Sequence, residues 1–256
     1  MAVDAGVVAS ALAASLQHLA DGLPGAWAAC DGGAVALVSG VGIPTLNGVW
    51  TERADANPAA VAGLLDRVGA SGVPYCLQLR PGADPALEQL AAERSMGLGD
   101  DIPLMVLEDS GDVMRMGQPA GLVIRQLSTH EAQLHADVAA VGFKAPEELL
   151  HQMVPADVLG LSGVRCYVGE VDGQAVTTGM GITLGGSVGV FTIATPPEYR
   201  RRGYGAAVTG RAVADGLADG AKWAWLQSTP IGYATYGRLG FRTVETWSCW
   251  GSLGRS

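Results

Sequence analysis

The sequence is poor in cysteine: it has four, Cys30, Cys76, Cys166 and Cys249, and no Cys-x-x-Cys pair. Structural zinc sites need closely spaced ligands, and small secreted domains need many disulfides, so neither is expected here. We therefore predict a protein that holds no metal and works in a reducing compartment, by default the cytoplasm.

Positive charge is scarce as well, because 16 lysines and arginines stand against 25 aspartates and glutamates, for a net charge of −9 at pH 7. Nucleic acids and anionic membranes are bound through clustered lysine and arginine, so neither is an expected partner. The sequence lacks an apolar run of about 18 residues, the length that crosses a bilayer. Its first apolar stretch, residues 5–16, has no basic residue before it, which is unlike a secretory signal.

Apolar residues are abundant: 48% of the 256 residues are hydrophobic and 16% are charged, as in a well-buried globular protein. This length suits one large domain or two small ones. In residues 4–108 the periodicity predicts the order helix, strands, helix, strand, helix and strand. One of these helices begins at Asn57-Pro58, since asparagine is a favoured N-cap and proline fits the first turn.

In the second half, residues 122–251, the periodicity predicts a strand, a helical region and three more strands. A helix, a strand, a helix and a last strand follow. Its first helix starts with a capping box in which Glu131 reaches back to the N–H of Ser128. The expected inner face of that helix is Leu134, Val138 and Val141.

The most informative stretch joins a predicted strand, residues 188–195, to a predicted helix over about residues 206–218. Three arginines are followed there by Gly203 and Gly205, at the start of the helix. A helix N-terminus has unpaired N–H groups and partial positive charge, glycine lets an anion approach closely, and arginine suits phosphate oxygens. The stretch predicts a phosphate or pyrophosphate site, with a solvated basic turn as the simpler alternative.

Two common phosphate motifs do not fit this stretch. A dinucleotide fingerprint needs a third glycine where Val208 stands, and no Gly-Lys-Ser/Thr of the Walker type follows. The spacing Arg200-x-x-Gly203-x-Gly205 is followed, 31 residues after Gly205, by Tyr236 and then by Gly240-Phe241. This combination resembles the GNAT acetyltransferase superfamily.

The resemblance implies a GNAT fold of the α/β (α+β) class, with two tandem halves that each have a mixed, mainly antiparallel sheet flanked by helices. The expected divisions are a degenerate GNAT-like domain at 1–110, a linker at 111–121 and a catalytic domain at 122–256. No Arg-x-x-Gly-x-Gly loop precedes the Asn57 helix, so the first half is expected to pack and shape a cleft. An unrelated α/β cap is the alternative for that half.

The resemblance also implies acetyl-CoA as co-substrate and direct attack of a primary amine on its thioester. The strand Ile193-Ala194-Thr195 would offer backbone groups to the pantetheine arm and splay from its neighbour at a bulge whose N–H stabilises the oxyanion. Thr229 stands where many members have an asparagine that contacts the cofactor. The residues that match the pyrophosphate loop are Arg200, Arg201, Arg202, Gly203, Tyr204, Gly205 and Ala206.

Tyr236 matches the family's general acid, which protonates the thiolate of CoA, and Tyr233 is the nearest alternative. Reference pKa values of about 10 for tyrosine and about 8.5 for a thiol make full proton transfer uphill by about 2 kcal/mol. Tyr236 would therefore either donate a strong hydrogen bond or need a lowered pKa.

The general base and the acceptor are not identified by the sequence. Glu170 and His151 are candidate bases, although a surface or structural role is the simpler explanation for each. The resemblance brings Phe143 and Met153 near the acceptor, with ordinary core packing as the simpler alternative. Core packing is the simpler explanation for Trp247, Cys249 and Trp250, and a lining of the acceptor pocket is the alternative. The expected partner is a small-molecule or peptide amine, and the protein is a monomer or a homodimer. Transfer of a longer acyl group, or acyl-CoA binding without turnover, stay open as alternatives.

Overall fold

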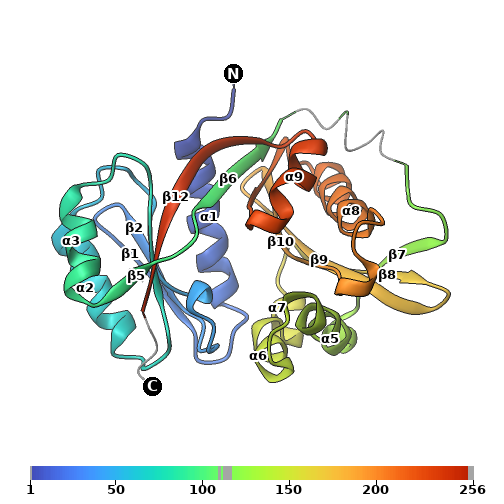
Figure 1. Cartoon of the computed structure of the whole chain (residues 1–256), viewed down its shortest axis with the longest axis horizontal. Helices are drawn as coiled ribbons and strands as arrows, with labels where there is room; N and C mark the ends of the chain where they lie inside the picture. Colours follow the sequence, from blue (N-terminus) through green and yellow to red (C-terminus); the bar gives the residue numbers. More distant parts are fainter. Residues whose placement is uncertain (1, 109–110, 112–116, 253–256) are drawn as a thin grey trace. The chain divides into compact units, whose positions relative to one another are not determined.

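The computed structural model describes residues 2–108, 111 and 117–252, and the chain divides into two compact units. Unit 1 spans Met1–Val3 and Met105–Arg242, and unit 2 spans Asp4–Leu104 and Thr243–Ser256 (Figure 1). Residues 112–116 of the predicted linker lie outside the described residues. No helix in the described ranges is long and apolar enough to span a membrane.

Unit 1 is built on a sheet with the strand order β6-β11-β10-β9-β8-β7. Its strands are β6 (Ile102–Leu107, which enters the unit at Met105), β7 (Leu122–Gln126), β8 (Val164–Val171), β9 (Gln174–Leu184), β10 (Ser187–Ala194) and β11 (Trp223–Gln227). Its helices are α5 (Ala132–Phe143), α6 (Glu147–Met153), α7 (Ala156–Leu159), α8 (Tyr204–Ala218) and α9 (Pro230–Arg238), with 3-10 turns η2 (Thr129–Glu131) and η3 (Pro197–Tyr199).

Strands β7 to β10 form an antiparallel meander, and β10 runs parallel to β11. Parallel neighbours need a crossover connection, which α8 provides here. Helix α8 lies on one face of the sheet, while α5, α6 and α7 gather on the other (Figure 1). Successive residues of β9 face opposite sides of the sheet. Gly179 lets Val208 of α8 approach closely on one side, and its neighbour Thr178 contacts His135 of α5 on the other.

The core of unit 1 between its sheet and helices α8 and α9 is mainly aliphatic. Helix α8 crosses β10 so closely that a Cβ added to Gly216 would lie 2.7 Å from the Cβ of Val188. The buried members of this cluster include Met105, Leu107, Val188, Val190, Val213, Leu226 and Phe241. Side chains from β6, β10, β11 and α8 therefore share one core, which holds the first half of β10 in place.

Unit 2 has the strand order β1-β2-β3-β4-β12, and β5 pairs with the outer part of β12. Its strands are β1 (Trp27–Asp31), β2 (Ala34–Val38), β3 (Asn47–Thr51), β4 (Cys76–Leu79), β5 (Met96–Leu98) and β12 (Arg242–Ser252, in unit 2 from Thr243). Its helices are α1 (Ala5–Ala20), α2 (Pro58–Gly69) and α3 (Pro85–Glu93), with the turn η1 (Pro44–Leu46). The mixed, mainly antiparallel sheets of both units confirm the predicted α/β class.

The two units repeat one connection. In each, an antiparallel set of strands leads through a helix to a parallel strand, by way of α8 in unit 1 and α2 in unit 2. The final strand of each repeat, however, lies wholly or partly in the other unit. Strand β12 follows α9 in the chain but pairs with β4 of unit 2, and Met105 and Leu107 of β6 join the core of unit 1.

These units differ from the divisions predicted at 1–110 and 122–256, because residues 243–252 belong with the first half of the chain. Periodicity identifies the final segment as a strand. It does not identify the partner strand, because the backbone N–H and C=O groups along a strand edge can pair with any other strand. Which half carries catalysis is not tested by this arrangement and stays a prediction.

The buried face of α5 also differs from the predicted one. Val141, expected inside, is 52% exposed, whereas His135 and Gly142 are buried. A Cβ on Gly142 would lie 2.8 Å from the Cβ of Ala194, so the helix packs on β10 through its smallest residue. The buried face of α5 is therefore set by the close contact between Gly142 and β10. A prediction based on the spacing of large apolar residues does not include such a contact.

Candidate functional site

The first turn of α8 follows a loop with two left-handed residues. Gly203 has φ 82° and ψ 0°, Arg201 has φ 61°, and no side chain caps the helix at Gly203. Left-handed residues next to right-handed ones turn successive N–H groups toward a common point, which favours anions. The loop and the first turn of α8 therefore have the backbone conformation and the uncapped N-terminus that an anion site requires, and the predicted phosphate site stays a prediction.

Gly205, in the first turn of α8, is also required by packing. A Cβ at this position would lie 3.2 Å from Oγ1 of Thr195 and 3.4 Å from Cγ2 of Ile193. The glycine therefore brings the helix against the end of β10, in addition to giving an anion room to approach. Tyr204 is buried beside it, and Ala206 is half-buried.

The equivalent helix of unit 2 has a closed N-terminus. The side chain of Asn57 accepts hydrogen bonds from the N–H groups of Ala59 at 2.9 Å and Ala60 at 3.1 Å. The N–H of Asn57 itself donates to the carbonyl of Gly32 in the β1–β2 turn at 2.8 Å. Because these first-turn donors are already used, α2 differs chemically from α8, as the missing glycine loop indicates.

Strand β10 leaves its neighbour partway along its length. The described pairing with β11 ends at Gly189 and Trp225, although the two strands continue to Ala194 and Gln227. The register with β9 shifts between Phe191 and Ala194, which marks a bulge. The splay and bulge expected from the GNAT resemblance are therefore present, and the β11-side edge of β10 is open beyond Gly189.

A buried histidine that the sequence analysis did not single out lies beneath this bulge. Nδ1 of His135 is 2.6 Å from Oγ1 of Thr178, and its Nε2 is 3.2 Å from Oγ1 of Thr192, a bulge residue with φ 49°. Burial lowers the pKa of His135 from 6.5 to about 4. The sequence does contain a sign of this role, because His135 is a single polar residue on a face of α5 that otherwise has small and apolar residues.

The side chain of Arg200 turns toward the protein. Its Nε donates to the carbonyl of Thr195 at 3.0 Å, and its Nη2 donates to the carbonyl of Gly142 at 2.6 Å. The first residue of the motif therefore ties the loop to the end of β10 and to α5, in addition to any part in anion binding. Arg201 and Arg202 are exposed, so their charge is the part of the run available to an incoming anion.

Replacing Arg200 by alanine should loosen the loop rather than only reduce its charge. Loss of two hydrogen bonds to backbone carbonyls is expected to destabilise the fold by about 1–3 kcal/mol. Thermal unfolding measures this effect. The matched variant Arg200→Lys keeps the charge but not the planar donor pair, so it should lose most of the same stability. A lysine variant as stable as the wild type contradicts this role.

Tyr236 lies on α9 with its ring against Phe241, at a centroid distance of 6.0 Å. Burial raises its pKa from 10.0 to about 12. Of the two explanations left open by the sequence, a lowered pKa therefore conflicts with the structure, and a hydrogen-bond donor agrees with it. Tyr233 is 46% exposed. Thr229 caps α9 by accepting from the N–H of Gly232 at 3.3 Å, a local role that explains a hydroxyl at this position.

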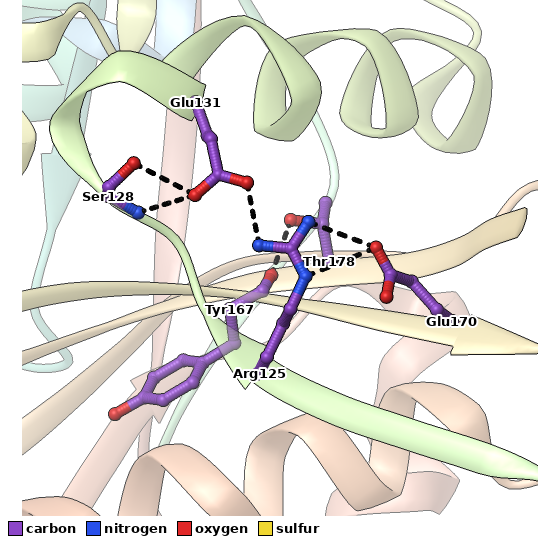
Figure 2. Close-up of polar contacts among 6 residues, drawn as sticks. All are labelled: Arg125, Ser128, Glu131, Tyr167, Glu170 and Thr178. Carbon is purple, nitrogen blue, oxygen red and sulfur yellow. Dashed lines mark hydrogen bonds and ion pairs between the residues drawn. The ribbon is translucent and has the colours of Figure 1, made fainter. Parts of the chain in front are cut away.

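Glu170 is held in an ion-pair network (Figure 2). Nη2 of Arg125 lies 3.0 Å from Oε1 of Glu170, and Nη1 of Arg125 lies 2.7 Å from Oε1 of Glu131. Glu131 completes the predicted capping box with Ser128, whose backbone N–H is the main cause that lowers the pKa of Glu131 to about 2. The network joins β7, β8 and η2, so it gives Glu170 a structural partner rather than a free carboxylate.

The second candidate base, His151, is also engaged. Its Nε2 lies 2.7 Å from Oδ1 of Asp137 and 3.5 Å from Oε1 of Glu147. Candidate ligand atoms of these three side chains lie within 4.8 Å of one another, which is close enough to share a metal ion. Exposed acidic groups have this spacing without a metal as well, so the predicted lack of a metal stays a prediction.

The other residues considered for the acceptor pocket separate into two groups. Trp247 and Cys249 are buried, and Trp250 packs against the core of unit 2, so core packing accounts for all three. Phe143 is 45% exposed at the end of α5, and Met153 is half-buried at the end of α6. These two stay candidates for the acceptor side of unit 1.

No protein-family model matches the chain, and no curated protein matches its sequence. Solved structures do match it. A GCN5-related N-acetyltransferase from Kribbella flavida is similar with a TM-score of 0.70 and 22% identity, over 98% of this chain and 97% of that one. The chain has the GNAT fold. A GCN5-related N-acetyltransferase-like protein from Streptococcus suis matches with a TM-score of 0.61 and 13% identity, over 88% of this chain and 87% of that one.

The GNAT likeness extends to a protein with two such halves. A tandem GNAT protein from the clavulanic acid biosynthesis pathway matches with a TM-score of 0.59 and 15% identity, over 91% of this chain and 85% of that one. The family resemblance drawn from the Arg200-x-x-Gly203-x-Gly205 spacing and Tyr236 is therefore confirmed for the fold. Chemistry does not follow from fold, so the function has to be argued from the site.

Proposed function

We propose that the protein is an acetyl-CoA-dependent N-acetyltransferase with its active site in unit 1. The observation that carries this proposal is the conjunction of an uncapped α8 N-terminus with the open edge of β10. An open strand edge binds an extended amide-bearing chain, and a helix N-terminus binds phosphate. A pantetheine arm joined to a pyrophosphate has both parts in this order.

The proposed reaction is direct transfer. The amine nitrogen attacks the thioester carbonyl, the C–N bond forms, and the C–S bond breaks to release CoA as the thiolate. A backbone N–H at the bulge of β10, near Thr192 and Ile193, would donate to the oxyanion. In this scheme the proton lost by the amine passes to water, since Glu170 is held by Arg125 and His151 is in contact with Asp137.

Tyr236 would stabilise the departing thiolate by donating a hydrogen bond. With its pKa raised to about 12, full transfer to a thiolate of pKa about 8.5 is uphill by about 5 kcal/mol, at about 1.4 kcal/mol per unit. A hydrogen bond to a charged acceptor has no such barrier and is worth about 1.5–3 kcal/mol. The proton that completes free CoA then comes from solvent after departure.

Replacing Tyr236 by phenylalanine separates turnover from binding. The rate constant kcat should fall about 10- to 100-fold, which corresponds to the lost hydrogen bond to a charged group, while the Kd for acetyl-CoA stays near that of the wild type. Thiol release measures the first quantity and calorimetry the second. Tyr233→Phe is the matched control on the same helix, and equal losses in both variants remove Tyr236 from the mechanism.

The engaged state of both candidate bases favours a second function, acyl-CoA binding without turnover. The two functions share the cofactor site and differ in catalysis. Calorimetric titration of the protein with acetyl-CoA, followed by thiol-release assays with a panel of small-molecule and peptide amines, distinguishes them. Micromolar binding with amine-dependent thiol release supports the transferase, binding alone supports the non-catalytic module, and no binding overturns both.

Chain length of the acyl group belongs to the same experiment. Titrations and thiol-release assays with butyryl-CoA and longer thioesters would compare acetyl transfer with the longer-acyl alternative.

We keep a cytoplasmic location and a monomer or homodimer as parts of the proposal. All four cysteines are free thiols in the described chain, which suits a reducing compartment.

A further inference from the structure

The histidine beneath the β10 bulge is the buried polar group that the proposed mechanism leaves unused. His135 comes from the inner face of α5 and is completely buried. Both of its ring nitrogens contact hydroxyl groups, Thr178 on β9 and Thr192 at the bulge of β10. One side chain therefore links the regular part of the sheet to its irregular part.

The hydrogen bonds around His135 define its tautomer. Oγ1 of Thr178 donates to the carbonyl of Tyr167 at 2.8 Å, a contact drawn in Figure 2. Having used its proton there, Thr178 can only accept from His135, so Nδ1 carries the imidazole hydrogen. Nε2 is then the acceptor, and the hydroxyl of Thr192 donates to it. Thr192 thus donates to His135, His135 donates to Thr178, and Thr178 donates to the carbonyl of Tyr167.

Thr192 needs such a restraint because its backbone is unusual. Its φ is 49°, a left-handed value that is strained for a β-branched residue. The residue lies inside the register shift of β10, so it lacks the regular ladder position of its neighbours. A conformation that is intrinsically disfavoured persists only where the surroundings determine it, and the His135 contact is a side-chain restraint on it.

We propose that His135 is a positioning residue: it holds the hydroxyl of Thr192 and thereby fixes the left-handed bulge that presents the edge of β10 to the acyl thioester. This inference rests on the proposed acyl-CoA site in unit 1. His135 does not contact the reacting atoms in this scheme. Its neutral state, with Nε2 unprotonated, is what the restraint requires.

Variants at Thr192 test the restraint without opening the core. Thr192→Val keeps the shape but removes the donor, and kcat/KM for acetyl-CoA is expected to fall about tenfold, a typical coupling for residues in direct contact. Thr192→Ser restores the donor and should recover most of that loss. If the valine variant matches the wild type, or serine fails to recover activity, the hydroxyl does not position the site.

A double-mutant cycle then separates positioning from general stability. His135→Leu should lower kcat/KM about tenfold in a wild-type background. In a Thr192→Gly background the same change should have little effect, because glycine adopts positive φ without strain and no longer needs the restraint. Equal losses in both backgrounds overturn the proposal, even where thermal unfolding shows that the leucine variant is less stable.

The tautomer gives a readout that does not depend on acetyl-CoA. Nitrogen NMR of His135 in the unliganded protein should show a neutral ring with the hydrogen on Nδ1, and an Nε2–H ring overturns the restraint. Failure of the proposed function has a different signature, namely a wild-type protein that neither binds acetyl-CoA nor releases thiol. A wild type that turns over, with an additive cycle, rejects the His135 inference alone.

Discussion

Acetyl-CoA binding should be lost when Arg202 and Gly203 are replaced together by alanine and glutamate. The glutamate would place a carboxylate at the N-cap of α8, where the proposed pyrophosphate binds. Two like charges about 4 Å apart repel by about 4 kcal/mol at an effective dielectric constant of about 20. A non-glycine residue at φ 82° adds strain of about 1–2 kcal/mol.

The expected result is a rise of at least about 100-fold in Kd, since each 1.4 kcal/mol is a factor of about ten. Calorimetry of the wild type and the double variant measures it. Circular dichroism and thermal unfolding show whether the variant keeps its fold, which should be the case because Arg202 and Gly203 are exposed.

The chain supplies a matched control in its other unit. Ala59 is exposed in the first turn of α2, so Ala59→Glu adds the same charge to the start of the equivalent helix. Asn57 already occupies the first-turn donors of α2, and acetyl-CoA binding should therefore be unchanged in this variant. Binding that survives in the α8 variant and disappears in the α2 variant would move the cofactor site to unit 2.

The sequence predicted the parts of the site that depend on backbone chemistry. Gly203 and Gly205 are recognisable because a left-handed cap and a close helix approach both exclude a side chain. Tyr236 was found by its spacing from that loop. The capping box of Ser128 and Glu131 is local, four residues long, and is present in the structure as predicted.

Features that depend on tertiary contacts were missed or assigned differently. Arg200 was read as a phosphate ligand, because nothing in the local sequence indicates that the carbonyls of Thr195 and Gly142 come within its reach. His135 was missed because its two partners are 43 and 57 residues away in the chain. The pairing of β12 with β4 likewise joins segments from different halves of the sequence.

Folding stability should fall between pH 6.5 and pH 4 because of His135. Burial lowers the pKa of this imidazole from 6.5 to about 4, and its contacts are to the uncharged hydroxyls of Thr178 and Thr192. In this window the unfolded chain binds a proton that the folded chain does not. Stability is therefore complete above pH 6.5 and decreases as the pH falls toward 4, by up to about 3 kcal/mol for this group.

Denaturant unfolding of the wild type and of His135→Gln, measured at several pH values across this window, isolates the contribution. Glutamine does not titrate, so the free energy of unfolding should depend less steeply on pH in the variant, and the two curves should converge at low pH. Glu131, whose pKa is lowered from 4.5 to about 2, loses its own contribution as the pH falls below about 4.5, but it does so equally in both proteins, so the difference between the two curves belongs to His135. Parallel curves would show that His135 titrates normally.

The same protonation has a consequence for the bulge. A proton on Nε2 removes the lone pair that accepts from Thr192, so His135 can no longer hold the left-handed conformation through this hydrogen bond. Loss of the bulge geometry should therefore accompany the loss of stability as the pH falls toward 4. Because glutamine offers a side-chain oxygen that does not titrate in this range, His135→Gln should retain the Thr192 contact at pH 5, where the wild type begins to lose it.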